Sequence, residues 1–240
     1  MALSGLDKQA AVRFFPHEIA DLAVALEFAQ ILNRQGFTTL WSTQHVTLLW
    51  ISLICMIPFD LAQFDEVGSE GQTAATIEAI AKRSLTSSGI VRESAAVLLS
   101  RLYVRYLKMY HAHPVNSIRC RRDGLLRFPA FLDWAKTYAK EQKDIFEVRH
   151  LLDSLGLLDL YFSQCMGVYH TLCEVVKNSP SSALSRFIPD FFEAARSLEL
   201  DSTLCTNSSI RKLRIKLLSR AALRLLPVIP RVSLRKGQRS

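Results

Sequence analysis

The residues from 41 to 65, WSTQHVTLLWISLICMIPFDLAQFD, constrain the fold more than any other part of the chain. From 46 to 59 they are almost wholly apolar, and either a membrane span or a buried helix could account for such a run. A span needs about 18 or more apolar residues to cross ~30 Å of hydrocarbon. This run is shorter, and it contains Thr47 and Ser52. We therefore predict a buried helix that ends at Pro58, and no transmembrane segment.

Apolar residues recur at helical spacing along most of the chain, which predicts an all-α fold. In the helix expected at about 89–110, Val91, Ala95 and Leu98 share one face, and Arg105 belongs to the polar side. We predict further helices at about 17–33, 41–55, 73–83, 128–139, 144–177, 188–198 and 208–226. The range 144–177 could be broken near Gly156 or Gly167. No alternating run between helices favours a strand, which argues against a βαβ fold.

Serial helices with short connections fit either a closed bundle or an α-solenoid. Residues 90–99, IVRESAAVLL, resemble the second helix of a HEAT repeat, and residues 187–192, FIPDFF, resemble a first helix with its early proline. In such repeats, every helix pair buries one face against the next pair. The sequence thus favours an α-solenoid of HEAT or armadillo type, without marking the repeat boundaries.

The positive charge of the chain is concentrated near its C-terminal end. The net charge is +8, yet all 22 acidic residues lie at or before Asp201, and ten of the 30 basic residues follow it. In 208–226 an apolar stripe is predicted, formed by Ile210, Leu213, Leu217, Ala221 and Leu225. Arg214 and Arg224 lie close to this stripe, where their stems could cover it while their guanidinium groups reach water.

This basic helix is the candidate binding surface, with Arg211, Lys212, Arg214 and Lys216 as its candidate residues. A solvated basic side of a final helix would explain the charge without a partner. The alternative explanation is that the helix binds a partner, which would be an acidic protein, an anionic lipid surface or RNA. No aromatic residue follows Phe192, which argues against base stacking and so against nucleic acid. The charge favours an acidic protein partner.

The sequence lacks the patterns that carry catalysis or a cofactor. It contains no G-x-S-x-G elbow, no Walker A loop and no G-x-G-x-x-G turn. Two groups have some metal-ligand character: His111 and His113 with Cys120, and His170 with Cys173. Neither supplies four ligands at zinc-finger spacing, so we interpret both as structural. We expect no catalytic residue, no metal and no cofactor.

Cysteine and tryptophan residues are both expected to have structural roles. The five cysteines are an odd number and form no C-x-x-C pair, which indicates a reduced, intracellular compartment. Trp41, Trp50 and Trp134 could anchor a partner, but each sits in an apolar helical context. We therefore predict all three tryptophans in the core.

Four stretches, in the same order, resemble the tubulin-folding cofactor D family, also called tubulin-specific chaperone D. Residues 48–61, LLWISLICMIPFDL, are similar to the L-L-W-L-S…C-L-I-P-F-D block of that family. Residues 95–101 (AAVLLSR), 131–134 (FLDW) and 210–220 (IRKLRIKLLSR) are similar to three later blocks. The resemblance runs from about residue 37 to the end.

The resemblance implies a non-enzymatic HEAT or armadillo-type chaperone of the cytoplasm and the microtubule cytoskeleton. Its implied partners are β-tubulin, tubulin-folding cofactors E and C with α-tubulin, and an Arf-like small GTPase. Within that assembly, the family promotes GTP hydrolysis by tubulin. The alternative is a generic α-solenoid adaptor whose basic helix binds an acidic partner, a membrane surface or RNA.

The resemblance also suggests a division of the chain into three parts. These are a poorly matched lead-in with one helix (1–36), a helical repeat segment (37–226) and a basic tail (227–240). Members of the family are several times longer. The chain therefore resembles an N-terminal portion or a truncated form, which puts full assembly activity in doubt.

Overall fold

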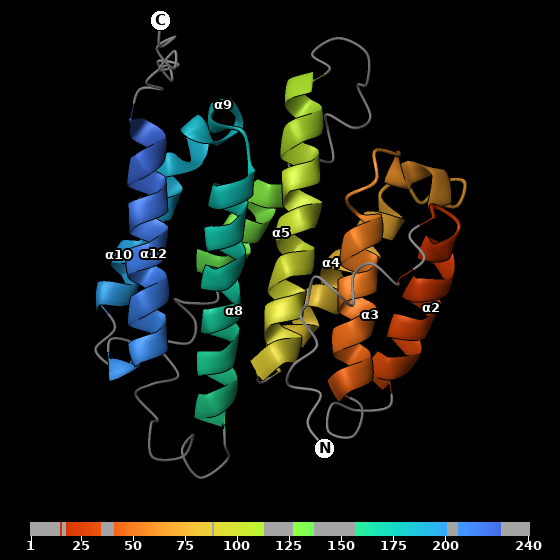
Figure 1. The fold of residues 1–240 in the computed structure, drawn as a ribbon, viewed down its shortest axis with the longest axis horizontal. Coiled ribbons are helices and arrows are strands. Elements are labelled where there is room, and N and C mark those ends of the chain that lie inside the picture. Colours follow the sequence, from red (N-terminus) through yellow and green to blue (C-terminus); the bar gives the residue numbers. More distant parts are fainter. Residues whose placement is uncertain are drawn as a thin grey trace, which may run out of the picture.

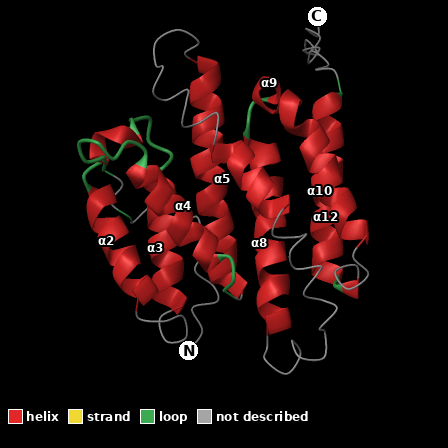
Figure 2. Ribbon diagram, turned by 180° about the vertical axis from the view of Figure 1, so that it is seen from behind, coloured by secondary structure: helices red, strands yellow, loops and turns green. Residues whose placement is uncertain are grey.

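The structure is a computed structural model that describes residues 15, 18–34, 41–87, 89–112, 127–136, 157–200 and 206–226. Every element in these ranges is a helix, and none of them contains a strand (Figure 2). The helices are α2 (Asp21–Arg34), α3 (Trp41–Ile54), η1 (Leu61–Phe64), α4 (Gln72–Ser84), α5 (Gly89–Ala112), α8 (Leu157–Asn178), α9 (Ser181–Leu184), η3 (Ser185–Phe187), α10 (Ile188–Leu200) and α12 (Ser208–Leu225). Residues 127–136 form a further helix. The predicted all-α fold is confirmed.

Four long helices form a row in which each packs against the next. They are α3, α5, α8 and α12, and all four run from the lower to the upper end of Figure 1. The helices α2, α4 and α10 return in the opposite direction and pack on α3, α5 and α12, respectively. This stack of repeated helix pairs is an α-solenoid, as predicted. α12 lies at one end of the row (Figure 1).

Aromatic rings join the helix 127–136 to its neighbours. Its Phe128 and Phe131 are fully buried beside Tyr103 of α5, with ring centroids 5.5 Å and 4.9 Å from the tyrosine ring. Phe128 also meets Phe187 edge to face at 5.0 Å, and contacts Phe191 of α10. Edge-to-face and offset pairs at these distances are favourable geometries for aromatic rings. These contacts make the core continuous along the solenoid.

The apolar run that opens the sequence forms α3 and the turn after it. α3 has 14 residues, which is too short to span a membrane, and eight of them are buried. The chain leaves the helix before Pro58, and Asp60 then accepts a hydrogen bond from the backbone N–H of Ala62 at the start of η1. The predicted buried helix is confirmed. Among the described helices, none is both long and apolar enough to cross a membrane.

The tryptophan prediction is wrong for one of the three residues. Trp41 is 52% exposed at the first position of α3. Trp50 and Trp134 are partly buried and pack against the core, as expected. Apolar context in the sequence therefore does not ensure burial at the first position of a helix.

Arginine side chains connect the C-terminal end of one helix in the row to the following helix. Arg105 of α5 is buried and donates hydrogen bonds to the carbonyl oxygens of Cys55 (3.1 Å) and Ile57 (2.6 Å), just after α3 ends. Its guanidinium group lies 4.6 Å from the centroid of the Phe59 ring. The assignment of Arg105 to a polar face of its helix is therefore wrong. Carbonyls at a helix C-terminus lack intrahelical partners and carry partial negative charge, which a buried arginine satisfies.

Gly167 lies inside α8 without breaking it. A Cβ atom at this position would stand 2.8 Å from Cδ2 and 3.1 Å from Cβ of Leu85, and 3.2 Å from Cγ of Arg92. The glycine thus permits close approach of α8 to the junction of α4 and α5. Of the two breaks left open by the sequence, that at Gly167 is absent, whereas Gly156 lies outside the described residues.

Replacing Arg105 by methionine should lower the free energy of unfolding by about 2–4 kcal/mol, because hydrogen bonds from a charged donor contribute ~1.5–3 kcal/mol each. The exposed Lys108 of the same helix provides the control, and Lys108→Met should change stability by less than ~0.5 kcal/mol. Urea unfolding of both variants measures the difference. Equal stability of the two variants would show that the contacts to Cys55 and Ile57 do not hold the helices together.

The substitution Gly167→Ala tests how closely α8 is packed. Alanine is favoured over glycine in a helix by ~1 kcal/mol, so an uncrowded site would become more stable. The contacts with Leu85 instead predict a loss of about 1–3 kcal/mol, typical of an overpacked core. Thermal unfolding gives the sign of the change, and a rise in the melting temperature would contradict the prediction.

Candidate partner-binding surface

The basic helix α12 is held by a cap at its start and by apolar contacts along one side. The side chain of Asn207 accepts hydrogen bonds from the backbone N–H groups of Ser209 (2.9 Å) and Ile210 (3.2 Å). Asparagine is among the best residues for this position. Leu217 and Ala221 are fully buried, where α12 packs on α8 and α10. The basic helix is thus a structural member of the solenoid.

The predicted apolar stripe of α12 is confirmed except at its end. Ile210, Leu217 and Ala221 are buried, and Leu213 is partly buried against the core. Leu225 was expected on the same stripe but is 63% exposed, because it lies in the last turn of α12.

Three arginines of α12 turn inward and bind backbone carbonyl groups. Arg214 donates from Nε to the carbonyl oxygen of Ala195 in α10 at 3.0 Å. Arg220 donates to the carbonyl oxygen of Cys173 at 2.6 Å and also pairs with Glu174 at 3.3 Å. These two contacts join α12 to both of its neighbours.

The third inward arginine, Arg224, binds the C-terminal end of α8. It donates to the carbonyl oxygens of Val176 (2.8 Å from Nη2) and Lys177 (2.7 Å), and to the Ser181 hydroxyl (3.0 Å). The sequence predicts that the guanidinium groups of Arg214 and Arg224 reach water. In the structure they instead bind backbone carbonyl groups. Arg224 binds carbonyls at the C-terminal end of α8, which lack intrahelical partners and attract cations, whereas Arg214 binds a carbonyl within α10.

The remaining three cations of α12 face outward. Arg211, Lys212 and Lys216 are exposed, and within the described part of the chain no side chain forms an ion pair with them. The structure thus brings three of the four candidate residues onto one open surface. The fourth, Arg214, is partly buried against α10.

Apolar side chains share this outward surface, which the analysis of the sequence missed. Ile215, Leu223 and Leu226 are each more than 60% exposed. They could have been noticed as apolar residues that do not belong to the stripe of Ile210 and Leu217. Ile215 and Leu223 lie on α12 and Leu226 directly follows it, so the surface is mixed in character.

Glu174 is the acidic group that pairs with the inward Arg220. Burial alone would raise its pKa, but the hydrogen bond from Arg220 and the charges of Lys177 and Arg220 outweigh burial and lower the pKa.

Asp65, just before α4, is a second carboxyl whose pKa is lowered despite burial. Burial opposes its ionisation, but hydrogen bonds from Thr73 and Gly71 lower its pKa.

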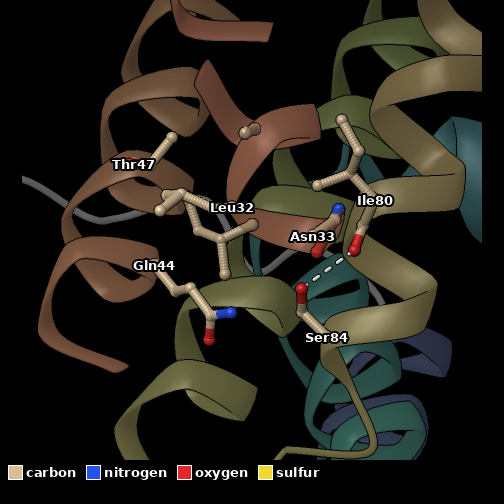
Figure 3. A pocket seen from close by; sticks show the side chains of 8 residues that line it. Leu32, Asn33, Gln44, Thr47, Ile80 and Ser84 are labelled. Atoms are coloured by element: carbon tan, nitrogen blue, oxygen red, sulfur yellow. Dashed lines mark hydrogen bonds between the residues drawn. The ribbon is translucent and has the colours of Figure 1, made fainter. Parts of the chain in front are cut away.

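A small pocket lies among α2, α3 and α4, and Figure 3 shows the side chains around it. Its empty space is about 200 Å³ even with open solvent included, below the ~300–1,000 Å³ of typical ligand sites. The hydroxyls of Thr47 and Ser84 donate to carbonyls of their own helices, at Thr43 and Ile80. The pocket is smaller than a typical small-molecule site.

Among the described residues, no group of three or more His, Cys, Asp or Glu side chains could hold a metal ion. Burial raises the pKa of the Cys173 thiol to about 11, and its Sγ donates to the Leu213 carbonyl at 3.5 Å. His113 and Cys120 lie outside the described residues, as does the side chain of His111. Burial likewise raises the pKa of Cys55 to about 12.

Stacked helix pairs define the class of this protein as an α-solenoid. Within that class, residues 6–113 match the family model described as tubulin-specific chaperone D-like, ARM repeat. This part of the chain is similar to the armadillo-repeat region of tubulin-specific chaperone D, in agreement with the resemblance found in the sequence. The match ends before α12, so the basic helix lies outside it.

A curated relative supports the same relationship over a longer range. The tubulin-folding cofactor D of Schizosaccharomyces pombe is 25% identical over 202 residues, which are 84% of this chain. The chain spans only 15% of the length of that relative. The comparison with solved structures gives no significant match.

Stability should fall in acid because of Glu174 and Asp65. A carboxyl whose pKa is lower in the folded than in the unfolded state stabilises the fold above its unfolded pKa of ~4. That contribution is lost as the pH falls through the folded value, so the free energy of unfolding should decrease from about pH 5 to about pH 3. Urea unfolding across this range measures the slope.

The variant Glu174→Gln measures the contribution of Glu174 to the pH dependence of stability. Glutamine cannot titrate, so the variant should be less stable than the parent chain at pH 7 but should lose less stability on acidification. An unchanged slope would show that the pair of Glu174 and Arg220 does not contribute to acid sensitivity.

Proposed function

We propose that the chain is a tubulin-folding chaperone of the cofactor D type, which binds β-tubulin after its release from the chaperonin. The observation that carries this proposal is the match of residues 6–113 to the tubulin-specific chaperone D-like armadillo-repeat family. The name and the extent of the S. pombe relative support it. An α-solenoid also suits such a client, since stacked helices present an extended surface to a large folded partner.

The proposal extends to the assembly in which such a chaperone works. The chain would take part in forming the α/β-tubulin heterodimer with tubulin-folding cofactors E and C and α-tubulin, and would contact an Arf-like small GTPase. Within that assembly it would promote GTP hydrolysis by tubulin. Its place would be the cytoplasm, at the microtubule cytoskeleton. It would act as a scaffold by non-covalent contacts, without catalytic residues of its own.

The exposed cations of α12 are the proposed contact with the client. Arg211, Lys212 and Lys216 project from one side of α12 and are open to solvent. Complementary charge mainly speeds association and orients the partner, because rim charges act over a distance before contact. Arg214 would support this surface by holding α12 on α10.

A second candidate function is that of a generic solenoid adaptor whose basic helix binds another acidic protein, a membrane surface or RNA. The position of α12 outside the family match favours this reading, because the match says nothing about the partner of that helix. The two candidates differ in whether β-tubulin itself binds. Co-migration of the chain with β-tubulin during size-exclusion chromatography tests this directly.

Reversing the three exposed charges (Arg211→Glu, Lys212→Glu and Lys216→Glu) should weaken β-tubulin binding by about tenfold or more at low salt. The reason is that exposed pairs contribute ~0.2–1 kcal/mol each, and reversal replaces attraction by repulsion. The difference should shrink at high salt, where exposed charges are screened. Titration of labelled tubulin at two salt concentrations measures both effects.

The matched control reverses three exposed cations on other helices, namely Arg83, Lys108 and Arg196. It changes the net charge equally, so any general electrostatic effect should appear in both variants. If both variants weakened β-tubulin binding equally, α12 would not be part of the binding surface. Unchanged binding by the first variant at low salt would contradict the proposed contact altogether.

A further inference from the structure

The two ends of the solenoid carry opposite charge. Residues 18–71, which contain α2, α3 and η1, hold seven acidic residues and one basic residue. The helix α12 holds six basic residues and no acidic one. The sequence between them, 72–201, is nearly balanced, with 14 acidic and 17 basic residues. Because α2 and α3 lie at the end of the row opposite α12 (Figure 1), the molecule is polarised along its length.

The outer side of α2 combines apolar side chains with negative charge. Val24, Phe28 and Ile31 are each at least 40% exposed, and their spacing of four and three residues places them on one face of the helix. Glu27 is exposed beside them, three positions after Val24 and four before Ile31. A terminal helix pair of a solenoid ordinarily has a polar outer face, because no further pair stacks on it. The apolar side chains of α2 thus favour a face that another element covers.

The outward side of α12 has the opposite charge and a similar mixture of side chains. Arg211, Lys212 and Lys216 are exposed there, and the exposed Ile215 lies among them. Leu223 is exposed about two turns after Ile215. The other side of α12 packs on α8 and α10, so this side faces away from both neighbours.

A contact between unlike ends of two molecules brings the opposite charges together. Two copies of α12 placed against each other supply no carboxylate, whichever way they run, because α12 contains none. The α2 side of a second copy supplies Glu27 together with apolar side chains that can pack on Ile215 and Leu223. Opposite charge orients the two surfaces, and the burial of apolar surface stabilises their contact. A second copy of the chain therefore provides both kinds of complementarity.

We propose that the chain associates with copies of itself end to end, with the α2 side of one copy against the outward side of α12 of the next. Such a contact uses two different surfaces, so it is heterologous and leaves one uncovered surface of each kind on every pair. Further copies can add at both ends, which gives chains or rings instead of a two-fold dimer. Self-association needs no client, so it is measured on the chain alone.

Sedimentation velocity of the full chain, from low to high micromolar concentration, measures this association. The weight-average sedimentation coefficient should rise with concentration beyond the value of a dimer. It should rise less at high salt, because exposed charges are then screened. A single monomeric species at every concentration would overturn the proposal. Growth that stops at a dimer would overturn it as well, in favour of two-fold pairing.

Two variants, each altered at one end, separate this contact from non-specific association. The α12 variant carries Arg211→Glu, Lys212→Glu and Lys216→Glu. The α2 variant carries Val24→Ser and Phe28→Ser. In each variant alone, the dissociation constant of self-association should rise at least about tenfold. An equimolar mixture should form dimers and nothing larger, since each variant supplies the surface that the other lacks. Undiminished association of either variant alone, or a mixture without dimers, would contradict the end-to-end contact.

Thermal unfolding of the two variants shows whether another part of the same chain covers α2. All five substituted side chains are exposed, so circular dichroism and the melting temperature at low concentration should match the parent chain. A lower melting temperature of the α2 variant would show that its residues pack within their own molecule, for instance against residues 1–17, and would refute docking of a second copy there. Co-migration with β-tubulin is measured separately, so failure of self-association leaves the proposed function standing, and the reverse also holds.

Discussion

Hydrogen bonds from arginine side chains to carbonyl groups at helix C-termini hold the row of parallel helices in register. Arg105 joins α5 to the end of α3, and Arg224 joins α12 to the end of α8. Parallel helices in one layer place their negative ends side by side, and carbonyls there have no partner within their own helix. A long cationic side chain from the next helix satisfies these carbonyls, and its fixed reach sets how far one helix can slide past the other.

The same contacts explain how a strongly basic helix can sit inside a packed solenoid. Charges buried without partners would be very costly. Arg214, Arg220 and Arg224 avoid that cost because each donates to backbone oxygens, and Arg220 also meets Glu174. The inward arginines are thus part of the core of the last helix pair, and only the outward cations remain for a partner.

The type and order of the helices could be predicted from the sequence because apolar periodicity persists over many turns. The predicted ranges agree with α3, α4 and α5 to within one to two residues at each end. The short elements η1, α9 and η3 were missed, since three or four residues show no periodicity. Two burial predictions failed for a related reason. Periodicity assigns a side chain to a face but cannot say whether a neighbouring helix covers that face, which decided the burial of Arg105 and the exposure of Trp41.

The candidate surface was predictable as a basic helix, but not which of its cations face outward. The chemical difference between arginine and lysine supplies a signal that charge counting ignores. A guanidinium group is weakly hydrated and offers several donors in a planar fork, whereas an ammonium group is strongly hydrated. On α12 the three inward cations are all arginines, and both lysines, Lys212 and Lys216, stay exposed. α5 repeats the pattern, with Arg105 buried and Lys108 exposed. Arg211 is the exception, because it is exposed like the two lysines. The residues that stabilise α12 therefore differ from those that face outward, and each set can change without the other.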